Sequence, residues 1–151
     1  MSEPLAVRPV TAAETRPLRQ RILRPHQRPE QLVYPHDDAP ETLHVAAFDG
    51  DAMVGTATIH LEPHPHTHAP AWRLRGMAVV PELRRRGCGA RLVDACIAHV
   101  RAHGGTLVWC NARVSAAPFY DSLGFVREGD AFELPEIGPH FLMKRELGVG
   151  D

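Results

Sequence analysis

Apolar residues alternate with polar ones, or form short runs, over several segments of the chain, and this pattern predicts β-strands. The clearest pair, residues 43–48 and 52–61, flanks Asp49-Gly50-Asp51, and an Asp-Gly turn between two such runs is typical of a β-hairpin. Five more strands are predicted at residues 5–10, 72–80, 106–110, 125–133 and 140–147. Pro9 either restricts the first of these to a sheet edge or cuts it short, because proline has no N–H to donate.

Apolar residues at helical spacing predict three helices. The clearest covers residues 87–103 and is followed by Gly104-Gly105, which ends it. A short helix is predicted at residues 116–123, and the first helix should end before Pro25. For the start of that first helix, Thr11 with Glu14 has the spacing of a capping box, whereas Thr15 as N-cap would place Pro17 more favourably in the first turn.

The order of these elements predicts the fold class. A strand, a helix and a strand follow one another from residue 72 to residue 110, which indicates a βαβ unit with two parallel strands. The remaining strands are joined by hairpins or loops, and the proline- and histidine-rich segments 25–40 and 62–70 are predicted loops. We therefore expect residues 1–151 to form a single α/β (mixed α+β) domain, with a mostly antiparallel sheet of about seven strands flanked by helices.

Composition and charge exclude several classes of protein. The chain has 151 residues, of which 44% are hydrophobic and 23% charged, as in an ordinary folded domain. A net charge of −1 provides no global attraction to nucleic acid or to an anionic membrane. No run reaches the roughly 18 apolar residues of a membrane span, and the start of the chain lacks the pattern of a signal peptide. We expect a cytoplasmic protein whose three cysteines are buried free thiols.

Candidate chemistry is concentrated in residues 84–90, between a predicted strand and the clearest helix. Gly87 and Gly89 let a ligand approach the backbone closely, and the first N–H groups of the helix favour an anion. Three consecutive arginines add donors for phosphate oxygens, so the segment predicts a diphosphate-binding turn. It is neither a nucleotide P-loop, since no lysine precedes Lys144, nor a dinucleotide fingerprint, since Leu92 stands where a glycine is needed.

Two motifs in this order resemble the GNAT N-acetyltransferase superfamily. Arg84-Arg85-Arg86-Gly87-Cys88-Gly89 matches its acetyl-CoA motif [RQ]-x-x-G-x-[GA], and residues 116–125 are similar to its A-x-x-[FL]-Y-x-x-x-G-F. The resemblance covers about residues 43–147, and the chain's ending, Gly138-Pro139-His140, is similar to a bacterial branch of the superfamily.

The resemblance implies acetyl-CoA as cosubstrate, with its diphosphate held by backbone amides of the turn and its carbonyl by amides of the preceding strand. Many members have an asparagine about seven residues before the tyrosine, but Arg113 occupies that position here, and Asn111 is the nearest asparagine. The residues assigned to the cofactor are Met77, Ala78, Val79, Arg84, Arg85, Arg86, Gly87, Cys88, Gly89, Ala90 and Asn111.

The implied reaction is direct attack of a primary amine of a small molecule on the thioester in a ternary complex. By resemblance, Tyr120 is the general acid that protonates the leaving thiolate. An alkylamine with a pKa near ~10 must also lose a proton. His140 is the first candidate base, and Glu133, His44 and Glu62 are alternatives.

The acceptor should lie against the segments least like the family, namely residues 24–41, the histidine-rich loop and the turn at residues 133–139. Four acidic residues there are candidates for binding a cationic amine: Asp37, Asp38, Glu41 and Glu136. A homodimer is compatible with the sequence.

A cluster of histidines, His60, His64, His66 and His68, provides an alternative chemistry. In an extended segment, alternate imidazoles point to one side and would catch a transition metal. Three prolines in the same stretch instead favour an irregular loop, and acyl transfer needs no Lewis acid, so we expect no metal requirement. Two other functions stay open at this point: a coenzyme-A-binding sensor without catalysis, and a metal-binding module.

Overall fold

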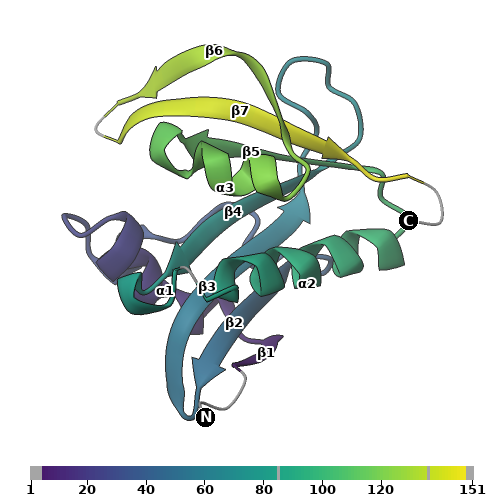
Figure 1. Ribbon diagram of the computed structural model, residues 1–151. Helices are drawn as coiled ribbons and strands as arrows, with labels where there is room; N and C mark the ends of the chain where they lie inside the picture. Colours follow the sequence, from purple (N-terminus) through teal and green to yellow (C-terminus); the bar gives the residue numbers. More distant parts are fainter. Residues whose placement is uncertain (1–4, 85, 136, 149–151) are drawn as a thin grey trace.

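Seven strands form one sheet in the order β1-β2-β3-β4-β5-β7-β6 in the computed structural model, which describes residues 5–84, 86–135 and 137–148 (Figure 1). The strands are β1 (Ala6–Pro9), β2 (Leu43–Asp49), β3 (Ala52–Leu61), β4 (Trp72–Val79), β5 (Leu107–Arg113), β6 (Val126–Leu134) and β7 (Gly138–Glu146). All neighbouring pairs are antiparallel except β4 and β5, which are parallel. The predicted fold class, the edge position of β1 and the parallel pair are confirmed.

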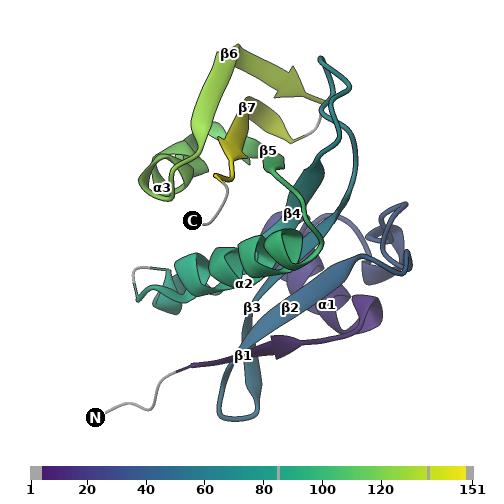
Figure 2. The same ribbon diagram turned by 90° about the vertical axis from the view of Figure 1, so that its right-hand side faces the viewer.

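Helices cover both faces of this sheet. The helix α2 (Cys88–Ala102) and the short α3 (Ala117–Ser122) lie on one face, and α1 (Ala12–Leu18) lies on the other (Figures 1 and 2). A π-helical turn, η1 (Arg19–Leu23), continues α1, and residues 25–40 contain only a short 3-10 turn (Pro29–Gln31). Two further 3-10 turns, Pro81–Leu83 and Val114–Ala116, precede α2 and α3. None of the described helices is long and apolar enough to cross a membrane.

The first helix begins at Thr11, so the prediction that favoured Thr15 as its N-cap is wrong. Thr11 and Glu14 form a complete capping box: the Glu14 N–H donates to the Thr11 hydroxyl and the Thr11 N–H to the Glu14 carboxylate. Two satisfied N–H groups at this end outweigh the cost of Pro17 inside the helix. The Thr15 hydroxyl instead donates to the Ala12 carbonyl at 2.6 Å.

The main core lies between α2 and the sheet. As the spacing predicts, α2 buries one apolar face, made of Leu92, Val93, Cys96, Ile97 and Val100. A Cβ at Gly55 of β3 would lie 3.0 Å from Leu92, so a glycine there allows the helix to pack closely on the sheet. All three cysteines are buried and free, as predicted.

The parallel strands β4 and β5 separate soon after they begin. Their pairing covers only Trp72 with Val108 and Arg73 with Trp109, although both strands continue beyond these residues. Strand β4 also contains a bulge: Thr58 and Thr56 of β3 pair with Arg75 and Ala78, so β4 has one extra residue in this interval. Backbone groups that would otherwise join β4 to β5 therefore line a split in the sheet, called here the β4–β5 split.

Candidate functional site

The turn that follows β4 brings the start of α2 beside the β4–β5 split. Gly87 is the N-cap of α2 and has φ of +79°, a conformation that glycine adopts without strain. No side chain of the described residues caps this helix end, so the N–H groups of its first turn, Cys88, Gly89 and Ala90, lack helical acceptors. A Cβ at Gly87 would meet nothing within 4 Å. This open turn fits a diphosphate.

The side chains of the turn have different roles. Gly89 is needed for packing, because a Cβ there would lie 2.9 Å from the Phe119 ring and 3.2 Å from Met77. Arg84 is exposed and donates through Nε to the Val79 carbonyl at 3.1 Å. Arg86 is also exposed, and Arg85 lies outside the described residues. Ala78 and Val79 are buried core residues, so only their backbone groups are available to a ligand.

Tyr120 lies in α3, next to the residue that packs on Gly89, so the two sequence motifs meet in space. Its ring packs against Phe119 and Phe125, with centroids 5.0 and 5.5 Å away. Burial, and then the nearby thiols of Cys110 and Cys96, raise the pKa of Tyr120 well above its usual value. Within the described part of the chain, the hydroxyl forms no hydrogen bond to another residue. It is therefore a neutral donor with an unused proton.

The predicted acid and base lie on opposite faces of the sheet. Cys110 and Ala112 of β5 belong to the core under α2 and α3, so strand alternation directs Asn111 and Arg113 to the other face. His140 of β7 pairs in register with Arg113 and shares that face with Leu142, which packs on Trp109. Its Nδ1 lies 2.8 Å from the Gly138 carbonyl, which leaves Nε2 as the nitrogen able to accept a proton.

The three alternative bases have other surroundings. Glu133 is exposed on β6. Glu62 forms an ion pair with Arg73 at 3.4 Å. His44 is buried and hydrogen-bonded through both ring nitrogens, to the Thr58 hydroxyl at 2.8 Å and to the Asp37 carbonyl at 2.9 Å. Because neither nitrogen of His44 is free, the structure argues against it as a base.

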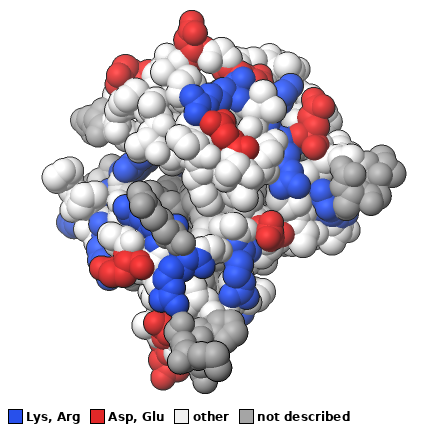
Figure 3. Space-filling view, in the orientation of Figure 1, with Lys and Arg blue, Asp and Glu red and all other residues white. Residues whose placement is uncertain are grey.

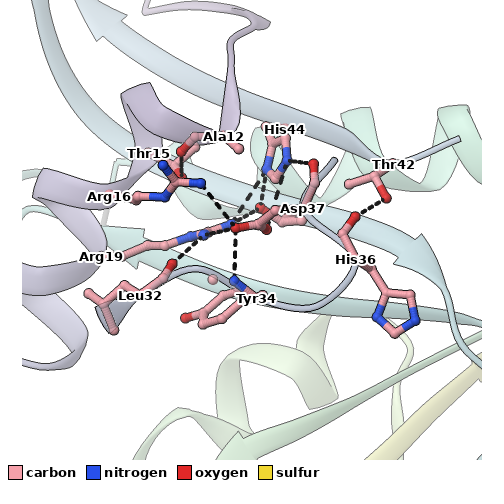
Figure 4. A network of polar contacts seen from close by, with 12 residues as sticks. Ala12, Thr15, Arg16, Arg19, Leu32, Tyr34, His36, Asp37, Thr42 and His44 are labelled. Atoms are coloured by element: carbon pink, nitrogen blue, oxygen red, sulfur yellow. Dashed lines mark hydrogen bonds and ion pairs between the residues drawn. The ribbon is translucent and has the colours of Figure 1, made fainter. Parts of the chain in front are cut away.

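A buried ion pair holds the segment 24–41 against the sheet (Figure 4). Arg19 of η1 forms two hydrogen bonds to Asp37, at 3.0 and 3.2 Å, and a third to Thr58 at 2.8 Å. Burial alone would raise the pKa of Asp37, but hydrogen bonds from Arg19 and from the Tyr34 N–H outweigh it and lower that pKa. Gly76, with φ of +64°, lies over this network, and a Cβ there would be 3.1 Å from Arg19 Nε.

This ion pair corrects one of the predictions from the sequence. Asp37 is buried and paired with Arg19, so it is not available to bind a cationic amine. Asp38 is exposed, Glu41 is partly buried, and Glu136 lies outside the described residues.

Several cations near the split have no role assigned from the sequence motifs. Arg113 donates through Nη2 to the Leu23 carbonyl at 2.7 Å, and its pKa is lowered by burial and then by Arg24 and Arg84. The space-filling view is hollowed between the half that carries β5–β7 and the rest, and Lys and Arg side chains gather beside the hollow (Figure 3). The sequence held one signal of this, because Arg73 and Arg75 alternate with buried residues of β4.

The four histidines of the predicted cluster do not come together. His60 lies within β3, whereas His64 binds Glu128 at 3.0 Å through Nε2 and accepts N–H groups of His66 and Thr67 through Nδ1. His64 thus resembles a satisfied structural histidine.

Among the described residues, one group could offer three metal ligands: His36, His60 and Glu62. His36 Nδ1 and His60 Nε2 lack hydrogen-bond partners and lie 3.8 and 3.9 Å from Glu62 Oε1. Their rings are stacked, however, with centroids 4.5 Å apart and planes within 7° of parallel. A metal lies near the plane of each imidazole that binds it, and two stacked parallel planes share no such point.

We therefore predict that removing divalent metal leaves the protein unchanged. A native metal bound only by the folded state would raise its melting temperature, and chelation would reverse that gain. Melting curves with and without EDTA should coincide. A drop of several degrees in the melting temperature, restored by Zn²⁺, would contradict this prediction.

Comparison with known proteins agrees with the geometry. Residues 11–125 match the family model described as the acetyltransferase (GNAT) family. The chain is 35% identical over 144 residues to the uncharacterized N-acetyltransferase YitI of Bacillus subtilis, covering 95% of this chain and 97% of that protein.

Solved structures show the same fold. The Escherichia coli protein ElaA has a TM-score of 0.74 at 20% identity, covering 95% of this chain and all of that one. A chain of the NatC complex bound to Gag peptide and CoA has a TM-score of 0.75 at 16% identity, covering 97% of this chain and 100% of that one. The sheet, the turn before α2 and the matched family model lead to one assignment: this chain belongs to the GNAT acetyltransferase family.

Proposed function

We propose that the protein, as one domain, is an acetyl-CoA-dependent N-acetyltransferase that acetylates a primary amine of a small molecule by direct attack in a ternary complex. The observation that carries this proposal is the β4–β5 split next to the open N-terminus of α2. An extended thioester arm fits between two separated strands, because their unpaired backbone groups offer it hydrogen bonds. The cation-rich turn beside the split suits the diphosphate end.

The two faces of the split suit the two halves of the reaction. When bound, acetyl-CoA supplies an activated acetyl group as a thioester. Tyr120 approaches from the face covered by α3, where its hydroxyl can donate to the leaving sulfur. The opposite face, with His140, Arg113 and the segment 24–41, is left for the acceptor.

The proton balance assigns a task to each group. The amine nitrogen bonds to the acetyl carbon, the carbon–sulfur bond breaks, and the products are an N-acetyl amide and the free thiol of coenzyme A. His140 Nε2, directly or through water, takes the proton that the amine loses, and Tyr120 gives one to the sulfur. We assign binding of the carbonyl oxygen, as it becomes negative, to those backbone amides of residues 77–79 that do not pair with β3.

Direct transfer is favoured over an acyl-enzyme on a cysteine. Burial raises the pKa of Cys96 to about 12, and burial likewise raises that of Cys110 to about 12. Cys88 is also buried, and burial raises its pKa. Because the thiolate is the nucleophilic form, none of these cysteines is activated.

A panel of primary amines tests this function. Consumption of acetyl-CoA that depends on one class of amine, with formation of the N-acetyl product, would support the transferase. Tight acetyl-CoA binding without turnover across the panel would favour the alternative, a coenzyme-A-binding sensor. The cytoplasmic location, the bacterial origin and a homodimer stay predictions, the last to be checked by sedimentation.

The cofactor turn is tested by a pair of variants at Gly87. Asparagine and aspartate tolerate positive φ best after glycine and suit a helix N-cap, so Gly87→Asn and Gly87→Asp should both fold. The two side chains have the same shape and differ in charge. We expect Gly87→Asp to weaken acetyl-CoA binding by at least about tenfold, roughly 1.4 kcal/mol, relative to Gly87→Asn. Equal affinities of the two variants in calorimetry would contradict a diphosphate at this turn.

A further inference from the structure

One cation beside the split, Arg75, has no ion-pair partner among the described residues. Arg75 lies on β4, two residues beyond Arg73, where pairing with β5 ends. It is half-buried, and its guanidinium carbon lies 3.8 Å from the centroid of the Tyr34 ring. Within the described part of the chain it forms no ion pair and no hydrogen bond.

Two carboxylates on this face, those of Glu62 and Asp37, are already paired with other arginines. Glu62 forms an ion pair with Arg73 at 3.4 Å, and Asp37 forms one with Arg19 at 3.0 Å. Arg16 Nη2 also lies 3.9 Å from Asp37 Oδ2. Burial, and then the neighbouring Arg73, lower the pKa of Arg75 to about 10, although Tyr34 and Glu62 act in the opposite direction, so the group is still charged at neutral pH. An unpaired, partly desolvated charge costs stability, and such a cost is typical of residues that bind a ligand.

Arg75 is also held in a defined orientation. Tyr34 lies between the two arginines that contact its ring, since Arg19 is 4.1 Å and Arg75 is 3.8 Å from its centroid. Tyr34 is fixed in turn by its N–H, which donates to Asp37 at 3.0 Å (Figure 4). A guanidinium that lies against a ring keeps its edge free, and that edge matches the two oxygens of a carboxylate.

The position fits the acceptor rather than the cofactor. Arg73 lies over Trp109, 4.8 Å from its centroid, and Arg75 shares this face of β4 by strand alternation. This is the face opposite α3 and Tyr120, which the proposed mechanism leaves to the acceptor.

We propose that Arg75 binds a carboxylate of the acceptor, so that the substrate class is a small molecule with both an amine and a carboxylate, such as an amino acid. This inference rests on the proposed function. It adds a contact for a carboxylate to the expectation of a cationic amine, for which Asp37, one of the four candidate acids, is no longer available.

Matched acceptors test the inference. Glycine, β-alanine, γ-aminobutyrate and a set of α-amino acids are each compared with the corresponding carboxamide, with aminoalkyl phosphates in the same panel. We expect the carboxylate member of the preferred pair to have at least about tenfold higher kcat/KM. Equal use of both members, or a preference for the phosphates, would overturn the inference.

Variants then assign the preference to one side chain. Arg75→Gln should raise KM for the carboxylate acceptor about tenfold, with no matching change for its carboxamide and with unchanged acetyl-CoA affinity. Arg75→Lys keeps the charge but loses the planar guanidinium, so its KM for the carboxylate acceptor should lie between those of the wild type and Arg75→Gln. Arg8→Gln is the matched control, because Arg8 also stacks on a ring, 4.0 Å from the Phe48 centroid, but lies on the edge strand β1. A carboxylate preference that survives Arg75→Gln would refute the role of Arg75.

A binding measurement keeps the inference testable without turnover. The corresponding N-acetyl amino acids and their amides are titrated by calorimetry into wild-type protein saturated with coenzyme A. Tighter binding of the acids, lost in Arg75→Gln and kept in Arg8→Gln, supports the inference even if no amine is acetylated. If amines are acetylated but the acids and amides bind alike, the proposed function stands and this inference fails.

Discussion

Replacing Tyr120 with phenylalanine is expected to lower kcat by on the order of 10²-fold while acetyl-CoA binds as before, because the variant loses only the proton donor to the leaving sulfur. The hydroxyl has no hydrogen-bond partner in the described part of the chain, so its removal leaves no unpaired group in the core. Steady-state kinetics with a preferred amine, together with calorimetry for acetyl-CoA, measures both quantities.

Ser122→Ala is the control for Tyr120→Phe. Ser122 ends the same helix, and its hydroxyl donates to the Phe119 carbonyl at 2.6 Å on the exposed side. This variant should keep wild-type kcat. A fully active Tyr120→Phe protein would show that the hydroxyl is not the general acid.

Replacing Asp37 with asparagine is expected to lower the free energy of unfolding by about 3–5 kcal/mol, the usual cost of breaking a buried ion pair. Asparagine keeps the shape of the side chain but leaves the buried charge of Arg19 without its counter-ion. Denaturant unfolding compares this variant with Asp121→Asn, which removes a partly exposed ion pair to Arg127 and should cost no more than about 1 kcal/mol.

The same variant predicts a pH dependence. The pKa of Asp37 is lower in the folded protein than in the unfolded chain, so its ionisation stabilises the fold. This contribution is fully present above the unfolded carboxyl pKa near ~4 and is lost as the pH falls through the folded value. The stability difference between wild type and Asp37→Asn should therefore shrink on acidification. A difference that is constant with pH would contradict the assignment.

Much of the fold was predictable because its elements follow from the pattern of apolar, polar and turn residues within short stretches of the sequence. The hairpin at Gly50, the amphipathic helix α2 and the strand before it depend on residues a few positions apart. The open turn at Gly87 follows equally from local features, a glycine at positive φ before an uncapped helix. The local error at Thr11 arose because two N-caps were compatible with the same pattern and hydrogen bonds decided between them.

The sequence by itself determined the elements, their order and the two motifs that identify the family. The tertiary structure alone decided which distant residues meet: that β4 and β5 part after Arg73, that Tyr120 and His140 take opposite faces, and that Asp37 pairs with Arg19. Periodicity shows which residues share a face of one element, but not which face of another element they meet. Charged residues illustrate this limit: that Arg75 has no ion-pair partner among the described residues is visible only once Glu62 and Asp37 are seen to pair with other arginines.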